Sequence, residues 1–280
     1  MEIIRVKSAG FCFGVKRAVK IALETAEKYK NRKIYTIGPI IHNRDVVKEL
    51  EKKGVKASES VNIRDSVVIL RSHGVEKENL VKLKENNNII IDAVCPYVKK
   101  IHKCVEDLKK DDYFLVIIGD KEHPEVKAIV SYAGDSNYKV VSNSEEIDGT
   151  FKKLKKIGIV AQTTQSLENY LNICMKILSL KAEFKIFNTI CDSTSIRQKE
   201  TVEVAKKVDC MIVIGGKHSA NTRRLFELSK EILDKVYYIE NENDLNLEIL
   251  KGKKRIGITA GASTPQNIIE GVVKKIRGLK

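Results

Sequence analysis

Short apolar runs, each followed by a polar turn and then by a helical pattern, recur along the whole chain. The runs 114–118 and 211–214 are typical, because four or five consecutive apolar residues suit a strand that is buried on both faces. Elsewhere apolar residues recur at helical spacing, as at Val15, Val19 and Ala22. An alternation of such strands with helices favours parallel sheets. The pattern therefore predicts an α/β protein of about nine strand–helix units, roughly 31 residues each.

One kind of unit ends its strand near a cysteine and then opens a helix. It occurs three times, at Cys12, Cys95 and Cys191, after the predicted strands 3–8, 89–94 and 184–190. Two of the helix starts have independent support, because Pro96 suits the first helical position and Asp192 is a capping residue. The cysteines therefore mark three repeats of similar length, and internal repetition is the most informative feature of the chain.

Two further kinds of unit occur in the same order within each repeat. In one, a strand ends at a glycine and a polar residue opens a helix four positions later. These pairs are Gly38 and His42, Gly119 and His123, and Gly215 and Ser219. In the other, a short apolar strand ends in a small polar turn, at 71–74, 161–164 and 260–265. Three sheets of about four strands fit these units better than one large sheet.

The polar residues of the pattern follow the carboxyl ends of strands, where ligands bind in open parallel sheets. Three similar modules around a pseudo-threefold axis would point these ends at one centre. That centre would hold the three cysteines and a set of polar side chains: His42, His73, His123, Glu125, Thr163, Thr164, Ser219, Asn221 and Ser263. The helix N-termini there would suit a phosphate or diphosphate, because backbone N–H groups and the helix dipole attract anions.

The six cysteines are thinly spread, and none forms a C-x-x-C pair, so neither a disulfide framework nor a zinc knuckle is expected. Three thiols at equivalent positions, each at a helix start that favours the thiolate, indicate a metal centre with one position left open. Zinc, which takes a fourth protein ligand in structural sites, and an iron–sulfur cluster both remain open on this reasoning. Cys104, Cys174 and Cys210 have no repeat equivalents and are interpreted as core residues.

Histidine at a helix start is more often a cap or a core residue than a ligand-binding group. The repeat favours the functional interpretation for His42 and His123, which share one position, and for His73, which lies in the third kind of unit. His102 lies inside a predicted helix and is interpreted as structural, whereas His218 stays undecided beside the motif.

Composition and charge narrow the classes of partner. The chain has 42 % hydrophobic residues and carries 51 Lys and Arg against 37 Asp and Glu, a net charge of +14. Its basic clusters are 152–156 and 251–255. We interpret them mainly as solvated surface; the alternative is that they attract an anionic ligand or an acidic protein partner. Only 6 % aromatic residues speak against nucleic-acid binding. Without an apolar stretch of about 18 residues or a secretory leader, we expect a cytoplasmic protein that does not bind membranes.

Taken together, the motifs resemble the 4-hydroxy-3-methylbut-2-enyl diphosphate reductase family from about residue 10 to the C-terminus. They are Gly10-Phe11-Cys12-Phe13-Gly14-Val15, His42-Asn43-Arg44, Ser72-His73-Gly74-Val75, Cys95-Pro96, His123-Pro124-Glu125-Val126, Gln162-Thr163-Thr164, Ile190-Cys191 and Thr259-Ala260-Gly261-Ala262-Ser263. The resemblance implies three similar parallel-sheet α/β domains in a pseudo-threefold trefoil around a central iron–sulfur cluster. It implies domains at 13–95, 96–191 and 192–280, the last joined by the N-terminal strand 1–12.

The same resemblance implies a site. One 4Fe-4S cluster per chain would have three cysteine ligands, Cys12, Cys95 and Cys191, and one open iron. Glu125, Thr163 and His123 would be catalytic, with Thr163 and Glu125 serving the substrate hydroxyl. The diphosphate substrate would be bound by His42, His73, His123, Thr163, Ser219, Asn221 and Ser263. The chain departs from the family at Ala220, where a second serine is frequent, so one side-chain donor is missing.

The reaction implied is reductive dehydroxylation to isopentenyl and dimethylallyl diphosphates, the last step of the methylerythritol phosphate route to isoprenoids. It consumes two electrons and two protons, and the family's electron donors are ferredoxin or flavodoxin. Glu125 suits the proton donor, because it is the only carboxylate at its repeat position, where the other modules have Arg44 and Asn221. Two alternatives stay open: an iron–sulfur hydro-lyase, which would turn over without a reductant, and an iron–sulfur regulator, which would bind nucleic acid in a salt-dependent way.

Overall fold

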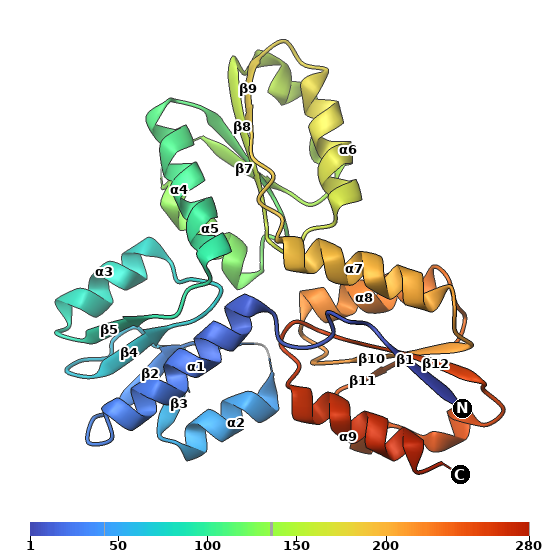
Figure 1. Cartoon of the computed structure of the whole chain (residues 1–280). Helices are drawn as coiled ribbons and strands as arrows, with labels where there is room; N and C mark the ends of the chain where they lie inside the picture. The colour runs from blue at the N-terminus through green and yellow to red at the C-terminus, as the bar shows by residue number, and fades with distance from the viewer. Residues whose placement is uncertain (42, 135–136, 280) are drawn as a thin grey trace. The chain divides into compact units, whose positions relative to one another are not determined.

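The computed structural model describes residues 1–41, 43–134 and 137–279, so the candidate His42 lies outside the described residues. The described part of the chain forms three four-stranded parallel sheets with flanking helices (Figure 1), which confirms the predicted fold class. Packing divides the chain into two compact units, each described here by itself. The first unit comprises 1–16, 41–52 and 192–280, and the second comprises 17–40 and 53–191. The boundary falls inside helix α1 (Phe13–Lys28).

The sheet of the first unit has the strand order β1 (Glu2–Arg5), β12 (Arg255–Ala260), β10 (Cys210–Ile214) and β11 (Val236–Ile239). The central strand β10 is buried on both faces, as its unbroken apolar run predicts. Its residues 210, 212 and 214 pack into the core that contains helix α9 (Gln266–Arg277), and residues 211 and 213 pack with helix α8 (Ala220–Lys230). Helices α2 (Arg44–Lys52) and α7 (Asp192–Ala205) belong to the same unit, as do the short 3-10 helices η3 (Glu242–Asp244) and η4 (Leu247–Leu250).

The second unit contains the other two sheets. One has the order β3 (Val55–Ser58), β2 (Ile34–Ile37), β4 (Val67–Leu70) and β5 (Ile89–Asp92). Helix α3 (Lys77–Glu85) connects β4 to β5 along the chain. The other has the order β7 (Tyr138–Val141), β6 (Phe114–Ile118), β8 (Lys156–Ala161) and β9 (Glu183–Ile186). Helices α4 (Pro96–Lys110) and α5 (Pro124–Ala133) cover one face of this sheet, and α6 (Leu167–Leu178) covers the opposite face (Figure 1).

The three sheets share one topology, which confirms the predicted repeat. In each, a strand that ends at a glycine (β2, β6 or β10) lies between the strand that follows it and the strand that ends in a polar turn (β4, β8 or β12). The fourth strand is the one that leads to a cysteine: β5, β9 and, for the first unit, β1. Glycines follow two of the helices: Gly54 follows α2 and Gly134 follows α5, with φ angles of +88° and +60° that favour glycine at the end of a helix.

The strands that lead to cysteines are shorter than predicted. β1 ends at Arg5 and β9 at Ile186, whereas the apolar pattern extended them to residues 8 and 190. At the end of β8, a side chain takes the place of the main-chain hydrogen bonds between β8 and β9. The Thr189 hydroxyl accepts from the N–H of Ala161 and donates to the C=O of the same residue. The sequence also gave no sign of the 3-10 helices η1 (Ser144–Glu146) and η2 (Gly149–Lys153), which Asn143 and Asp148 cap.

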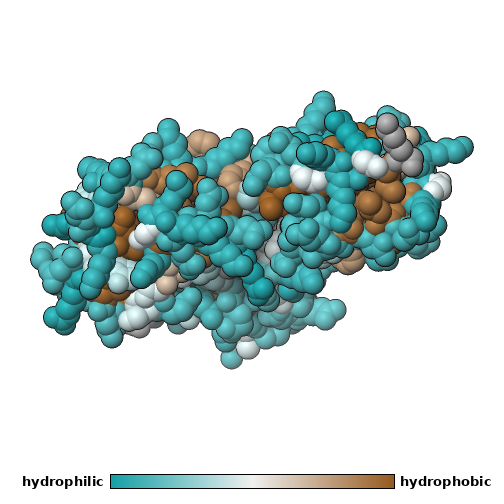
Figure 2. Space-filling model, turned by 90° about the horizontal axis from the view of Figure 1, so that it is seen from below, coloured by the Kyte–Doolittle hydropathy of each residue, from teal (hydrophilic) through white to brown (hydrophobic). Residues whose placement is uncertain are grey.

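Hydrophilic side chains cover most of the face shown in Figure 2, and hydrophobic residues show between them. This distribution is what a chain with 31 % charged residues predicts. No helix among the described residues has the length and apolar character needed to cross a membrane.

Candidate active site

Each of the three repeat cysteines is fixed by its backbone to the polar turn of its own module. The N–H of Cys95 donates to the C=O of Ser72 at 2.9 Å, and the N–H of Cys191 donates to the C=O of Thr163 at 2.9 Å, both in the second unit. In the first unit the N–H of Cys12 donates to the C=O of Ala262 at 3.2 Å. A helix begins at the next residue in every case, at 13, 96 and 192. The three cysteines are therefore structurally equivalent, as the repeat predicts.

The other three cysteines lie in different surroundings. Cys174 and Cys210 are buried in apolar cores, and Cys104 packs against the core beneath α4 and α5. Burial raises the pKa of all three thiols, so they stay protonated and inert at neutral pH. Their interpretation as core residues is confirmed.

The donor set fits a cluster with three cysteine ligands, since each of Cys12, Cys95 and Cys191 has a half-exposed side chain at a helix start. Cys12 belongs to the first unit, whereas Cys95 and Cys191 belong to the second. In neither unit do the described residues include a group of three or more His, Cys, Asp or Glu that could hold a metal ion. The cluster itself therefore stays a prediction.

Two histidines of the predicted centre lie together in the second unit. The rings of His73, after β4, and His123, at the start of α5, pack edge to face with their centroids 5.6 Å apart. His123 also caps α5, because its Nδ1 accepts a hydrogen bond from the N–H of Glu125 at 3.1 Å. In a neutral ring whose Nδ1 accepts this bond, the proton resides on Nε2. The cap and the functional interpretation of His123 are thus compatible.

Glu125 and Thr163 form a buried pair in the same unit. The Glu125 carboxylate accepts hydrogen bonds from the Thr163 N–H at 2.6 Å and from the Thr163 Oγ1 at 2.8 Å. Glu125 is only 1 % exposed, and this burial raises the pKa of its carboxyl, although the two bonds from Thr163 oppose the shift. A carboxyl whose pKa is raised can stay protonated and donate its proton to a reacting group. The structure therefore joins the two residues expected to serve a hydroxyl group.

Gln162 has a part in this arrangement that the sequence did not reveal. Its Oε1 accepts a hydrogen bond from the N–H of Asp120, in the turn before α5, and its Nε2 donates to Thr164 Oγ1, both at 3.1 Å. The side chain therefore ties the turn that precedes His123 and Glu125 to the turn that contains Thr163. The motif Gln162-Thr163-Thr164 was visible in the sequence, but the partner Asp120 is 42 positions away.

The first unit contains the remaining candidates, Ser219, Asn221 and Ser263. Ser219 caps α8, with its Oγ accepting from the N–H of Thr222 at 3.3 Å. Asn221, in the first turn of α8, is 5 % exposed, and neither its Nδ2 nor its Oδ1 has a hydrogen-bond partner among the described residues. A buried amide without protein partners costs free energy, which keeps Asn221 a candidate for contact with a ligand or an ordered water.

The turn that contains Ser263 packs closely on the start of α8. A Cβ at Gly261 would overlap Thr222, and the Thr264 hydroxyl donates to the C=O of Ile214 at 3.0 Å. Glycine is therefore required where the two segments meet. Ser263 itself is buried, whereas His218, which the sequence left undecided, is exposed beside the cap.

Comparison with known proteins places these features in a family. A family model described as LytB protein matches residues 3–277. A 4-hydroxy-3-methylbut-2-enyl diphosphate reductase of Geobacter metallireducens is 48 % identical over 278 residues, which cover 99 % of this chain and 97 % of that protein. The enzyme of the same name from Pelobacter propionicus is 46 % identical over 277 residues, 99 % of this chain and 98 % of that protein.

Two solved structures are also similar. One is of an (E)-4-hydroxy-3-methyl-but-2-enyl diphosphate reductase, the terminal enzyme of the non-mevalonate pathway. It is 45 % identical, has a TM-score of 0.75, and each chain is covered completely. The other, the E-1-hydroxy-2-methyl-but-2-enyl-4-diphosphate reductase of Plasmodium falciparum, is 29 % identical with a TM-score of 0.89. Its match covers 98 % of this chain and 87 % of that one.

Proposed function

Since the chain belongs to the LytB protein family, we propose that it reduces 4-hydroxy-3-methylbut-2-enyl diphosphate to isopentenyl and dimethylallyl diphosphates. This is the last step of the methylerythritol phosphate pathway. The substrate hydroxyl leaves as water, and a hydrogen takes its place or is added at the allylic position, at the expense of two electrons and two protons. The observation that carries the proposal is the buried Glu125–Thr163 pair, which lies two residues from the cap His123.

The proposed cofactor is one 4Fe-4S cluster per chain, with Cys12, Cys95 and Cys191 as its three ligands. The equivalent backbone bonds and helix starts of these cysteines support the assignment. When bound, the cluster would supply electrons one at a time and a Lewis acid for the oxygen of the substrate hydroxyl. The raised thiol pKa values of Cys104, Cys174 and Cys210 support their exclusion from the ligand set.

The diphosphate is bound by neutral hydrogen-bond donors. His123 and His73, whose rings pack edge to face, belong to this set. Asn221 contributes a buried amide whose hydrogen-bonding groups need a ligand. The set is completed by Ser219, Ser263, Thr163 and the undescribed His42. Neutral donors suit this task, because each bond to a charged oxygen adds roughly 1.5–3 kcal/mol.

The proton that leaves with the hydroxyl comes from Glu125. Burial raises the pKa of this carboxyl and so favours its protonated form, and Thr163 Oγ1, 2.8 Å away, holds the hydroxyl or relays the proton. Expulsion of water costs far less than expulsion of hydroxide from an allylic carbon. After the transfer, the N–H and hydroxyl of Thr163 stabilise the Glu125 carboxylate.

The electrons come from a small acidic carrier, ferredoxin or flavodoxin, in the cytoplasm. The net charge of +14 supports this partner, because opposite charge accelerates association. Nucleic acid and membranes are not partners in this proposal. The chain's low aromatic content supports the first exclusion.

The test uses anaerobically purified protein with its cluster, a chemical reductant and the substrate. Release of both isoprenoid diphosphates in a single turnover is expected. Glu125→Gln should keep the visible absorption of the cluster and bind substrate, yet lose turnover by roughly 10²-fold or more. Glu122→Gln is the matched control, since Glu122 is exposed and pairs with Lys127 at 2.8 Å.

Two results would count against the proposal. Turnover at the full rate in Glu125→Gln would mean that the proton comes from another group. Turnover without any reductant would favour a hydro-lyase, which also uses an open iron but needs no electrons.

A further inference from the structure

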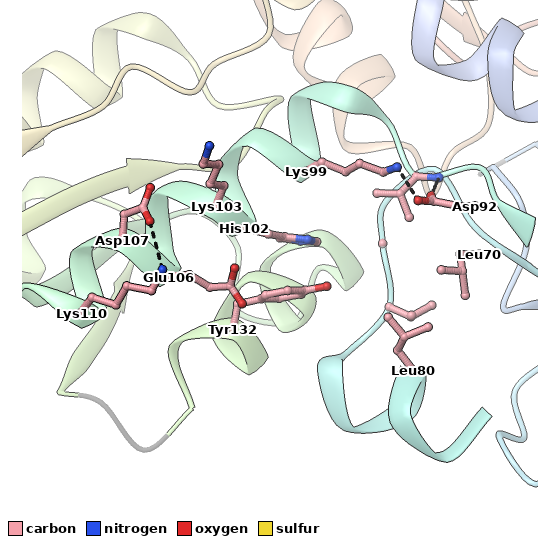
Figure 3. A pocket seen from close by; sticks show the side chains of 13 residues that line it. Leu70, Leu80, Asp92, Lys99, His102, Lys103, Glu106, Asp107, Lys110 and Tyr132 are labelled. Carbon is pink, nitrogen blue, oxygen red and sulfur yellow. Dashed lines mark hydrogen bonds and ion pairs between the residues drawn. The ribbon is translucent and has the colours of Figure 1, made fainter. Parts of the chain in front are cut away.

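A cavity of about 460 Å³ lies in the second unit behind the turn that contains His73. Its walls come from that turn, from α3, and from α4 and α5, as Figure 3 shows. Two pairs of its charged residues neutralise each other, Lys99 with Asp92 and Lys110 with Asp107. Two aromatic side chains, His102 from α4 and Tyr132 from α5, lie side by side in its wall (Figure 3).

His102 is held rigidly although its sequence position suggested only a core residue. It is 6 % exposed, and its ring stacks on Tyr132 with centroids 4.0 Å apart and planes 16° from parallel. Burial lowers the pKa of His102 to about 4, although Glu106 and Asp92 oppose the shift, so the ring is neutral at neutral pH. Its Nε2 is buried and has no hydrogen-bond partner among the described residues. A buried nitrogen without a protein partner costs free energy, so any stabilising contribution of His102 has to come from the packing of its ring.

The edge of the His102 ring faces Gly74 and leaves no room for a side chain there. This glycine has a φ angle of +81°, and a Cβ added to it would lie 3.0 Å from His102 Cε1 and 3.5 Å from the Cβ of Ala128. The turn is closed by Arg71, whose C=O accepts from the Gly74 N–H at 3.0 Å. His73 is one of the two residues between them. Its ring therefore depends on how Gly74 lies against α4 and α5.

We propose that His102 is a positioning residue: stacked on Tyr132, it fixes Gly74 and thereby the His73 ring beside His123. Helix α5 lies near both ends of this arrangement, because a Cβ added to Gly74 would lie 3.5 Å from the Ala128 Cβ, and His123 contacts the His73 ring. The inference rests on the proposed function, in which His73 binds the diphosphate. It adds a residue that touches no substrate but sets the spacing of two that do.

The test measures the dissociation constant for substrate by calorimetry on the holoprotein, together with KM and kcat. His102→Ala should weaken binding by at least about tenfold, the loss expected when one hydrogen bond to a charged group is misplaced. KM should rise with it, and kcat should change much less. His102→Phe, which keeps an aromatic ring on Tyr132 and replaces both ring nitrogens by carbon, should restore most of the affinity.

A double-mutant cycle tests the contact itself. Gly74→Ala should weaken binding, because the added Cβ would press against the His102 ring. His102→Ala opens space for that Cβ, so the double variant should bind better than the sum of the two single losses predicts. Gly252→Ala is the control for backbone strain, because Gly252 has a φ angle of +73° with nothing within 4 Å of an added Cβ. It should leave substrate binding unchanged.

The outcomes separate this inference from the proposed function. If His73→Ala does not weaken binding of the substrate, the role of His73 in the site is wrong. If His73→Ala weakens binding and His102→Ala does not, the positioning role of His102 is wrong. Equal losses in His102→Ala and His102→Phe, or strictly additive losses in the cycle, would also overturn it. Melting temperatures of all variants identify any loss that is due to unfolding.

Discussion

Replacing Glu125 by Gln should stabilise the folded protein at mildly alkaline pH while it removes turnover. The side chain is 1 % exposed, and its oxygens accept from the Thr163 N–H at 2.6 Å and from Thr163 Oγ1 at 2.8 Å. Glutamine has the same shape. Its oxygen can keep the bond from the backbone N–H, and its amide can donate to the Thr163 hydroxyl. The packing is conserved, and the main change is the loss of a titratable proton.

The sign of the effect follows from the raised pKa of the Glu125 carboxyl, whose cause is burial. The folded protein keeps this proton at pH values where the unfolded chain has already lost it. The free energy of unfolding therefore falls as pH rises from the ordinary pKa of a glutamate to the raised one. One proton gives a slope of about 1.4 kcal/mol per pH unit across that window. Since glutamine has no such proton, the variant gains stability relative to the wild type over the same window.

The assay is denaturant unfolding of the anaerobic holoprotein at a series of pH values from about 4 to 9. Subtracting the wild type from the variant at each pH cancels the titration of all other groups. Glu122→Gln should change the free energy of unfolding in the opposite direction, because the bond from Lys127 lowers the pKa of that exposed carboxyl. Its removal should cost a little stability at neutral pH and nothing under acidic conditions.

A stability difference between Glu125→Gln and the wild type that does not change with pH would refute the reasoning. It would mean that Glu125 titrates alike in the folded and unfolded chain. A variant that becomes less stable than the wild type as pH rises would show that the two bonds from Thr163 outweigh burial, and the carboxyl would then enter the reaction ionised.

Three further outcomes are expected. Cys95→Ser should deplete the iron and the visible absorption of the purified protein, whereas Cys104→Ser should keep both; an intact, active cluster in Cys95→Ser would remove that residue from the ligand set. Asn221→Leu should weaken binding of the substrate by at least about tenfold while the melting temperature stays or rises, because the buried amide has no protein partner to lose; unchanged affinity would assign the amide to another role. Gly261→Ala should lower the melting temperature and the affinity for substrate together, since its Cβ would overlap Thr222, and a variant with wild-type values would contradict the close packing of the two segments.

The sheets and their repeat were predictable because the signals are local. Apolar runs such as β10 are buried on both faces, and glycines with positive φ angles end α2 and α5 where the sequence places them. Of the candidate site, the equivalence of Cys12, Cys95 and Cys191 also followed from local spacing.

The remaining features depend on contacts between distant positions. The end of β9 is set by the Thr189 hydroxyl, which takes over the ladder bonds of Ala161. Gln162 acquires its role from Asp120, and His102 acquires its role from Gly74, 28 positions earlier. The apolar periodicity of a helix cannot distinguish an aromatic side chain that only fills the core from one that also packs against a neighbouring turn. The pairing of Glu125 with Thr163 was suggested by the motifs, but its burial and hence its pKa needed the structure.

The amide bonds that hold Cys12, Cys95 and Cys191 are made by the main chain and are therefore indifferent to the side chain. These main-chain bonds do not themselves require a cysteine. The proposed ligand role is what would require the same residue at all three positions. On this proposal, a related protein that no longer catalyses the reaction would keep the three sheets but lose the cysteines at these three positions. Sequence surveys can test this expectation.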